Sequence, residues 1–266
     1  MNAYTVTKKK VALLALYLAS AAGIASAFAE DARSIIEASR NRISASTVSS
    51  RARMVITSKD GTSSERLIDQ YSSDTDGANR TMIVFQKPAS VAGTRFLTIE
   101  KADGGEDRWI FLPALGKVRR VAASEGSGSF VGTDFSYDDI SSANRSASAD
   151  VHTLVREEEY GISLCYVIES VPKDSAYQYS KMVSWTAKDT LVSLKIELYD
   201  RKGKLVKTVE MLDVQAVQGR LTPTLTRMKT HASGTSTEIR MEILRYDDPI
   251  PAAVFTTDYL LTGRLR

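Results

Sequence analysis

The chain has few side chains of the types that do chemistry, and their spacing matches no catalytic or metal-binding motif. His152 and His231 lie far apart in sequence, and neither belongs to an HExxH, CxxC or His-x-His element. No GxSxG motif is present to supply a nucleophilic serine. The single Cys165 lies in an apolar run without a nearby histidine, which is typical of a buried small hydrophobe.

Two further groups of residues resemble functional sites. Asp134, Asp138 and Asp139 carry oxygen ligands of the kind that Ca²⁺ prefers, but they lack the alternating order of a calcium loop. Residues 126–132 resemble a phosphate loop, yet the third glycine comes one residue late and no helical pattern follows. We therefore predict no catalytic residue, no metal site and no cofactor. An exported hydrolase with two converging carboxylates remains an alternative, since their separation is a three-dimensional quantity.

The first 29 residues have the pattern of a secretory signal peptide. Three lysines at 8–10 precede an apolar run of about 14 residues, which is short of the roughly 20 needed to span a bilayer. Cleavage after Ala29 would leave residues 30–266 as one exported, soluble domain. The leader holds three lysines and no acid, so of 35 basic and 32 acidic residues the mature chain would keep 32 of each. This balance gives no support to nucleic acid as a partner.

The mature sequence reads as one helix followed by many strands. Ala32, Ile35, Ile36 and Ile43 repeat at helical spacing, so residues 31–43 are expected to form an amphipathic helix. About a dozen apolar runs separated by turn signals such as Asp60-Gly61 follow. Two more short helices are expected near 137–141 and 256–261. The pattern predicts a mainly β protein, a single antiparallel, strongly curved sheet or incomplete barrel. A domain boundary near residue 150 is the less favoured alternative.

A sheet of this size has more apolar concave surface than one helix covers, so part of it should line a cavity for a hydrophobic ligand. A slip of one residue would exchange the two faces of a strand. The predicted lining residues are Ile56, Ile83, Phe85, Leu97, Ile99, Trp109, Phe111, Ile168, Trp185, Ile196, Leu198 and Met241. Phe130, Phe135 and Tyr137 are predicted to form a mobile flap beside the cavity, because small and polar residues flank them.

Three segments carry a resemblance to a known family: Trp109 to Arg120 (WIFLPALGKVRR), Ser129 to Asp139 (SFVGTDFSYDD) and Ala253 to Leu260 (AVFTTDYL). Over essentially the whole mature chain, the sequence resembles the LolA-like outer-membrane lipoprotein-sorting proteins, in particular the longer branch associated with RND/MMPL-type transporters. The resemblance implies an incomplete β-barrel with a helical lid, and a non-catalytic periplasmic carrier that shields the acyl chains of lipoproteins or lipids. An outer-membrane acceptor and an inner-membrane transporter are the implied partners.

A second function is compatible with the same fold. Lys117, Arg119 and Arg120 are interspersed with valines along one predicted strand and form a basic edge. This edge would let the protein act as a sensor or accessory module that docks a membrane transporter or regulator, as RseB-like proteins do. The carrier is the function that we predict, and the docking module is the alternative.

Overall fold

The computed structural model describes residues 32–75, 78–101, 105–141 and 145–265, so the predicted signal peptide lies outside the described residues. The described chain forms one sheet of thirteen strands, and every pair of neighbours is antiparallel. Among the described residues no helix is long and apolar enough to cross a membrane. The strands are β1 (Thr47–Thr57), β2 (Ser63–Thr75), β3 (Ala78–Lys87), β4 (Arg95–Glu100), β5 (Glu106–Leu112), β6 (Lys117–Arg120), β7 (Asp150–Tyr160), β8 (Ser163–Pro172), β9 (Lys181–Ala187), β10 (Ser193–Tyr199), β11 (Leu205–Val217), β12 (Arg220–Thr230) and β13 (Thr235–Tyr246).

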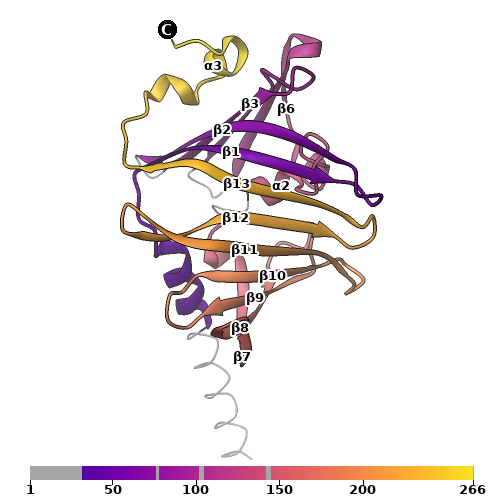
Figure 1. The fold of residues 1–266 in the computed structure, drawn as a ribbon, viewed down its shortest axis with the longest axis vertical. Coiled ribbons are helices and arrows are strands. Elements are labelled where there is room, and N and C mark those ends of the chain that lie inside the picture. The colour runs from indigo at the N-terminus through magenta and orange to yellow at the C-terminus, as the bar shows by residue number, and fades with distance from the viewer. Residues whose placement is uncertain (1–31, 76–77, 102–104, 142–144, 266) are drawn as a thin grey trace, which may run out of the picture.

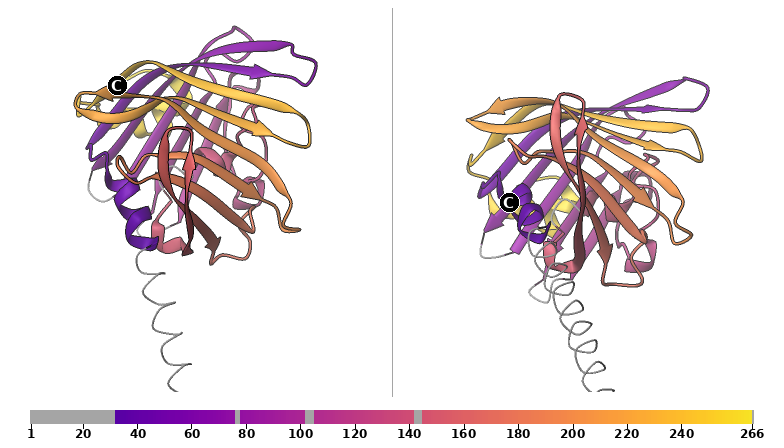
Figure 2. Two further views of the ribbon diagram at one scale, coloured as in Figure 1. Left: turned by 60° about the horizontal axis from the view of Figure 1, so that its bottom comes forward. Right: turned by 90° about the horizontal axis from the view of Figure 1, so that it is seen from below.

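The order of strands is β6-β5-β4-β3-β2-β1-β13-β12-β11-β10-β9-β8-β7, so β6 and β7 are the two edges of the sheet. β1 pairs with β13 at the middle of the sheet and joins the two arms. The sheet bends strongly, as Figures 1 and 2 show, and its two edge strands do not pair with each other. The prediction of one curved, incomplete antiparallel barrel is therefore confirmed.

The concave face holds the largest apolar cluster. It combines Ile83 and Phe85 of β3 with Leu198 of β10 and Val209 of β11, strands from opposite arms of the sheet. Residues of opposite arms can share one cluster only on the inside of the curve. The same face of β8 carries Ile168, which packs against Ala32 and Ile36 of the N-terminal helix, residues 32–41. The predicted amphipathic helix is thus confirmed, and it covers one end of the concave face.

The convex face of β3 to β6 is also apolar, because the C-terminal strap (residues 250–262) covers it. The strap contains the 3-10 helix η5 (Ala252–Phe255) and α3 (Thr257–Thr262), and it buries Val254, Phe255 and Leu260 against the sheet. Arg95 fastens its end by donating hydrogen bonds to the carbonyl oxygens of Leu260 and Leu261 at 2.6 and 2.9 Å. Figure 1 shows α3 outside the curve of the sheet. Cation-bearing side chains near the last carbonyls of a helix stabilise it.

The convex face outside the area under the strap is exposed to solvent and charged. Arg53 of β1 forms ion pairs with Glu242 of β13 at 2.7 Å and with Glu65 of β2 at 3.3 Å. Arg227 of β12 continues the row through Glu238 at 2.7 Å. This alternation of an apolar inner face and a polar outer face is the pattern expected of an antiparallel sheet with one solvated side.

Candidate functional site

The predicted lining residues divide between the two faces of the sheet. Ile56, Ile83, Phe85, Ile196, Leu198 and Met241 belong to the concave cluster or pack against it. Ile168 also faces inward, but it lies under the N-terminal helix. The prediction is wrong for the five others: Leu97, Ile99, Trp109 and Phe111 lie on the convex face under the C-terminal strap, and Trp185 lies on the convex face with Cys165 and Val167.

On β4 and β5, the residues that face inward are those that alternate with the predicted lining residues. Phe96 and Ile110 are paired across the two strands and are buried in the concave cluster. Thr98 pairs with Arg108, and Glu100 pairs with Glu106, on the same face. The inner face of these strands is therefore apolar in its middle and charged at its end. Cys165 is a free, fully buried thiol, as a small core hydrophobe would be.

The centre of the concave face is occupied by the plug, residues 126–141, which ends in α2 (Tyr137–Ser141). Phe130 is 0% exposed, and its ring centre lies 5.2 Å from that of Phe96, 5.6 Å from that of Tyr137 and 5.8 Å from that of Phe85. The prediction of a flap beside the cavity is corrected here: Phe130, Phe135 and Tyr137 are buried inside the concavity. Aromatic contacts of this geometry add stability beyond the area they bury.

Three carboxylates of the plug attach it to three different walls. Asp134 accepts hydrogen bonds from Thr230 at 2.6 Å and from Thr237 at 2.7 Å, in the hairpin of β12 and β13. Asp138 accepts from Arg108 of β5 at 2.6 Å. Asp139 accepts from Lys207 of β11 at 2.7 Å and from the Tyr179 hydroxyl at 2.8 Å.

The predicted acidic cluster thus has a structural role in each of its members. Among the described residues no group of three His, Cys, Asp or Glu side chains is placed to hold a metal ion. Asp134, Asp138 and Asp139 each accept hydrogen bonds from a different wall, so these three do not form the converging pair that the hydrolase alternative requires. The sequence marks Asp134 as a member of an acidic cluster, but its role as an anchor depends on Thr230 and Thr237, which lie about 100 residues away.

The tip of the plug has an unusual backbone. Val131 has φ of 50° and Gly132 has φ of 76°, both in the left-handed region. That conformation is common for glycine and strained for a β-branched residue such as valine. Arg66 of β2 donates a hydrogen bond to the Val131 carbonyl at 2.5 Å and lies 5.7 Å from the centre of the Phe85 ring. The glycines of residues 126–132 therefore shape the plug, and we see in them no phosphate site.

Beside the plug, the concave face keeps a band of half-buried apolar side chains. This band consists of Ile56, Met182, Ile196, Met211, Ile239 and Met241. Three of the six are methionines, whose flexible and polarisable side chains adapt to ligands of different shape. The plug therefore fills the middle of the concavity but leaves apolar surface on β1 and on β9 to β13.

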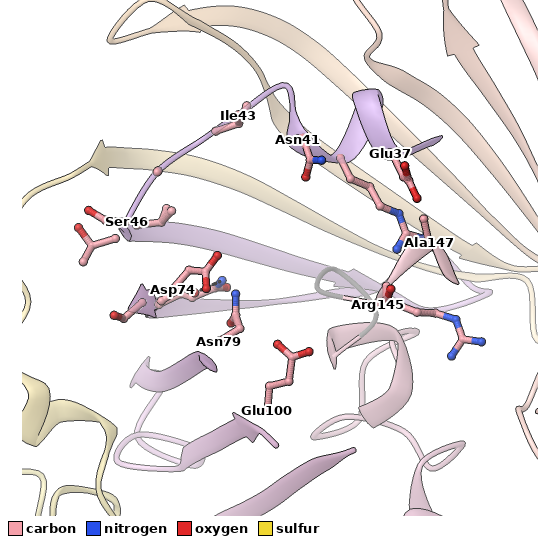
Figure 3. Close-up of a pocket in the computed structure, with 17 residues that line it drawn as sticks. Glu37, Asn41, Ile43, Ser46, Asp74, Asn79, Glu100, Arg145 and Ala147 are labelled. Carbon is pink, nitrogen blue, oxygen red and sulfur yellow. Dashed lines mark hydrogen bonds between the residues drawn. The ribbon is translucent and has the colours of Figure 1, made fainter. Parts of the chain in front are cut away.

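Two neighbouring cavities open on the concave side, where the edges of the sheet face each other. The larger, of about 950 Å³, has Arg120 to Ser124 after β6 on one side and Arg145, Ala149 and Tyr177 on the other. The smaller, of about 590 Å³, lies between the N-terminal helix and the ends of β1 to β4. Figure 3 shows Glu37, Asn41 and Ala147 on one side of this smaller cavity and Asp74, Asn79 and Glu100 on the other.

The residues of the predicted basic edge lie on β6, at one edge of the sheet. Arg119 forms an ion pair with Glu125 at 2.8 Å, and Arg120 contacts Asp107. Lys117 is exposed. Two of the three cations are thus partly neutralised by neighbouring acids, and exposed pairs of this kind contribute little energy. Docking of a partner through this edge stays a prediction.

His152 has a structural role near the smaller cavity, which Ala147 lines. Its Nε2 lies 2.8 Å from the carbonyl oxygen of Ala147, and its Nδ1 lies 2.7 Å from the Ser170 hydroxyl. The carbonyl can only accept, so Nε2 carries the proton and Nδ1 accepts from the serine in the neutral ring. Desolvation by burial lowers the pKa of His152 from its ordinary value of 6.5, more than the Ala147 hydrogen bond and Asp150 raise it.

We expect this histidine to make stability depend on pH. With its pKa depressed in the folded protein, the unfolded chain binds the proton first, so His152 contributes its full stability above about pH 6.5 and loses it as the pH falls below that value. The slope from one such group is at most about 1.4 kcal/mol per pH unit. Urea unfolding at a series of pH values should show this slope, and H152Q should lack it. An equal slope in both proteins would contradict the assignment.

Comparison with known proteins gives several matches over most of the chain. A family model with the description "Uncharacterized protein" matches residues 77–262. The solved structure of a DUF1329 family protein from Desulfovibrio piger is 30% identical, with a TM-score of 0.83, and the match covers 88% of this chain and 99% of that chain. No curated protein matches.

Two further solved structures are similar. A putative outer membrane lipoprotein-sorting protein domain from Vibrio parahaemolyticus is 28% identical, with a TM-score of 0.82 and coverage of 88% of this chain and 99% of that chain. A LolA superfamily protein from Nitrosomonas europaea is 22% identical, with a TM-score of 0.68 and coverage of 86% and 98%. The last of these is a likeness of fold. The resemblance seen in the sequence is therefore confirmed.

Proposed function

Because the chain belongs to the DUF1329 family and shares its fold with lipoprotein-sorting proteins of the LolA superfamily, we propose that it is a non-catalytic carrier that shields acyl chains in its concave face. The cargo is a lipoprotein or a lipid on its way to the outer membrane. The predicted signal peptide, cut after Ala29, places the carrier in the periplasm. An RND/MMPL-type transporter and an outer-membrane acceptor are the partners that this proposal implies.

One observation carries the proposal: the band of half-buried apolar side chains beside the plug. An alkyl chain laid on this band gains about 0.8 kcal/mol for each CH₂ group that leaves water. The plug is held to the walls by polar contacts and by the packing of its aromatic residues, and a longer chain would gain further surface by taking the place of these residues. The larger cavity reaches the concave cluster at Val121 and Tyr177.

Substitution of one inner residue tests the carrier. Met241 and Ile243 lie on β13, but Met241 pairs with Ala52 on the inner face while Ile243 pairs with Arg51 and is 49% exposed. We expect M241E to weaken binding of a fluorescent fatty acid at least about tenfold, because the ligand would bury a carboxylate. The matched variant I243E should bind as the unmodified protein does.

Native mass spectrometry of the gently purified protein gives an independent measurement, since a bound lipid adds its mass. A protein that is free of lipid and also fails to take up the fluorescent fatty acid would refute the carrier. Equal loss of binding in M241E and I243E would place the ligand elsewhere than on the inner face.

A further inference from the structure

The smaller cavity has walls of opposite charge. Its acidic wall includes Glu100, which also borders the larger cavity. There Glu100 lies directly across from Glu106, and Asp138 of the plug shares the lining. A single cation, Arg108, serves Glu106 at 2.7 Å and Asp138 at 2.6 Å. Like charges directly opposite on neighbouring strands destabilise a sheet. Arg108 is engaged by Glu106 and Asp138, and the structure gives Glu100 no ion pair among the described residues.

Glu100 is the least satisfied member of the acidic wall. It is half-buried, it borders both cavities, and among the residues that the structure describes it has neither an ion pair nor a hydrogen bond to its side chain. Asp74, at the end of β2, extends the same wall. A half-buried carboxylate without a partner is costly unless a ligand supplies the opposite charge.

The opposite wall carries Arg40 and Arg145, together with Glu37, whose charge is paired with Arg33. Arg145 is held by Asp150 at 2.6 Å and lies 4.1 Å from the centre of the Tyr177 ring. Arg40, on the N-terminal helix, borders the cavity and makes no ion pair within the described part of the chain. The Arg40 side chain is exposed to solvent on one side, yet desolvation by the surrounding walls lowers the pKa of its guanidinium. The positive charge of Arg145 also lowers this pKa, whereas the negative charge of Asp150 raises it.

We propose that this cavity binds a zwitterionic group, with its ammonium at Glu100 and its anion at Arg40. Other side chains that line the cavity, among them Asn41, Gln70 and Ser72, offer neutral hydrogen-bonding groups. A cavity of about 590 Å³ is of the size that holds small ligands. The zwitterion is the head group of a phospholipid or a free molecule of the same chemistry. The phospholipid alternative rests on the proposed carrier function, and it adds that the carrier prefers lipids with a zwitterionic head group.

The test uses the exported chain and three soluble probes. Phosphoethanolamine carries both charges, whereas glycerol phosphate carries only the anion and ethanolamine only the cation. Calorimetry should show that phosphoethanolamine binds at least about tenfold more tightly than either, since each charged hydrogen bond contributes roughly a factor of ten. E100Q and R40Q should each remove about that factor, while E65Q and R240Q on the convex face serve as matched controls.

A second arm separates the two sources of the zwitterion. Vesicles of phosphatidylethanolamine with phosphatidylcholine, and vesicles of phosphatidylglycerol, are offered to the protein, and the extracted lipid is weighed by native mass spectrometry. Preference for the zwitterionic vesicles that E100Q abolishes supports a lipid head-group site. Binding of phosphoethanolamine without lipid extraction supports a site for a free zwitterion and counts against the carrier.

The inference fails if phosphoethanolamine binds no better than the single-charge probes, or if E100Q and R40Q bind as the controls do. In that case uptake of the fluorescent fatty acid still decides the carrier function separately. Loss of the fatty acid without loss of phosphoethanolamine would reject the carrier alone.

Discussion

Replacement of Phe130 by alanine is expected to lower the free energy of unfolding by about 3–5 kcal/mol, the usual cost of removing a buried aromatic ring. The ring is fully buried and contacts Phe85, Phe96 and Tyr137 from the middle of the plug. Its removal costs both transfer energy and a cavity, because residues held on a rigid sheet cannot collapse into the space. Urea unfolding followed by circular dichroism measures the change.

The same variant reports on function. An apolar cavity lined by aromatic rings stays dry and takes up small apolar molecules. If acyl chains occupy the place of the plug, F130A should bind a fluorescent fatty acid more tightly than the unmodified protein despite its lower stability. L115A, which truncates a side chain that is 62% exposed, should change neither quantity. A stability loss below about 1 kcal/mol would show that the interior is looser than its contacts indicate.

The sequence predicted well those features that local patterns determine. Apolar and polar residues alternate along much of β10 and β13, which predicts Ile196, Leu198 and Met241 on the inner face, where they are found. The alternation fails where a β-bulge shifts the register. Leu194 and Ile243 therefore lie on the convex face, although the pattern predicts them on the inner one. The turns at 60–61 and 201–204 join strands as their Asp-Gly and Lys-Gly pairs indicate. The short helices α2 and α3 lie within one residue of the predicted ranges.

The face of β4 and β5 could not be predicted from alternation. In Trp109-Ile110-Phe111 all three residues are large and apolar, so a period of two cannot select an inner side. Both faces are apolar because two distant segments cover them, the plug inside and the strap outside. The strap follows β5 by more than 130 residues in the sequence, and only folding of the whole chain brings it to this surface.

The plug illustrates a second limit. Its small and glycine-rich residues predicted an exposed loop, yet the aromatic residues among them are buried. What decides its position is a set of contacts with residues far along the chain, such as Asp134 with Thr237, which are 103 residues apart. Sequence periodicity carries no signal for contacts of this kind.

Removal of that contact provides the second large effect. D134A is expected to lower the free energy of unfolding by about 2–4 kcal/mol, since it leaves the buried hydroxyl of Thr237 and the half-buried hydroxyls of Thr230 and Thr235 without their acceptor. Asp134 also accepts these bonds at a buried site, with 8% of its surface exposed, so water cannot replace it easily. D134N keeps one acceptor oxygen and should lose less.

D60A is the matched control, because the Asp60 carboxylate accepts from the Thr62 hydroxyl at 2.7 Å in an exposed turn, where water replaces the lost partner. Hydrogen exchange of the plug amides locates the effect: D134A should speed exchange in residues 128–137 before it affects β12 and β13. Faster exchange with a raised affinity for the fluorescent fatty acid would show that Asp134 holds the plug against ligand. Equal unfolding curves for D134A and D60A would contradict this anchoring role.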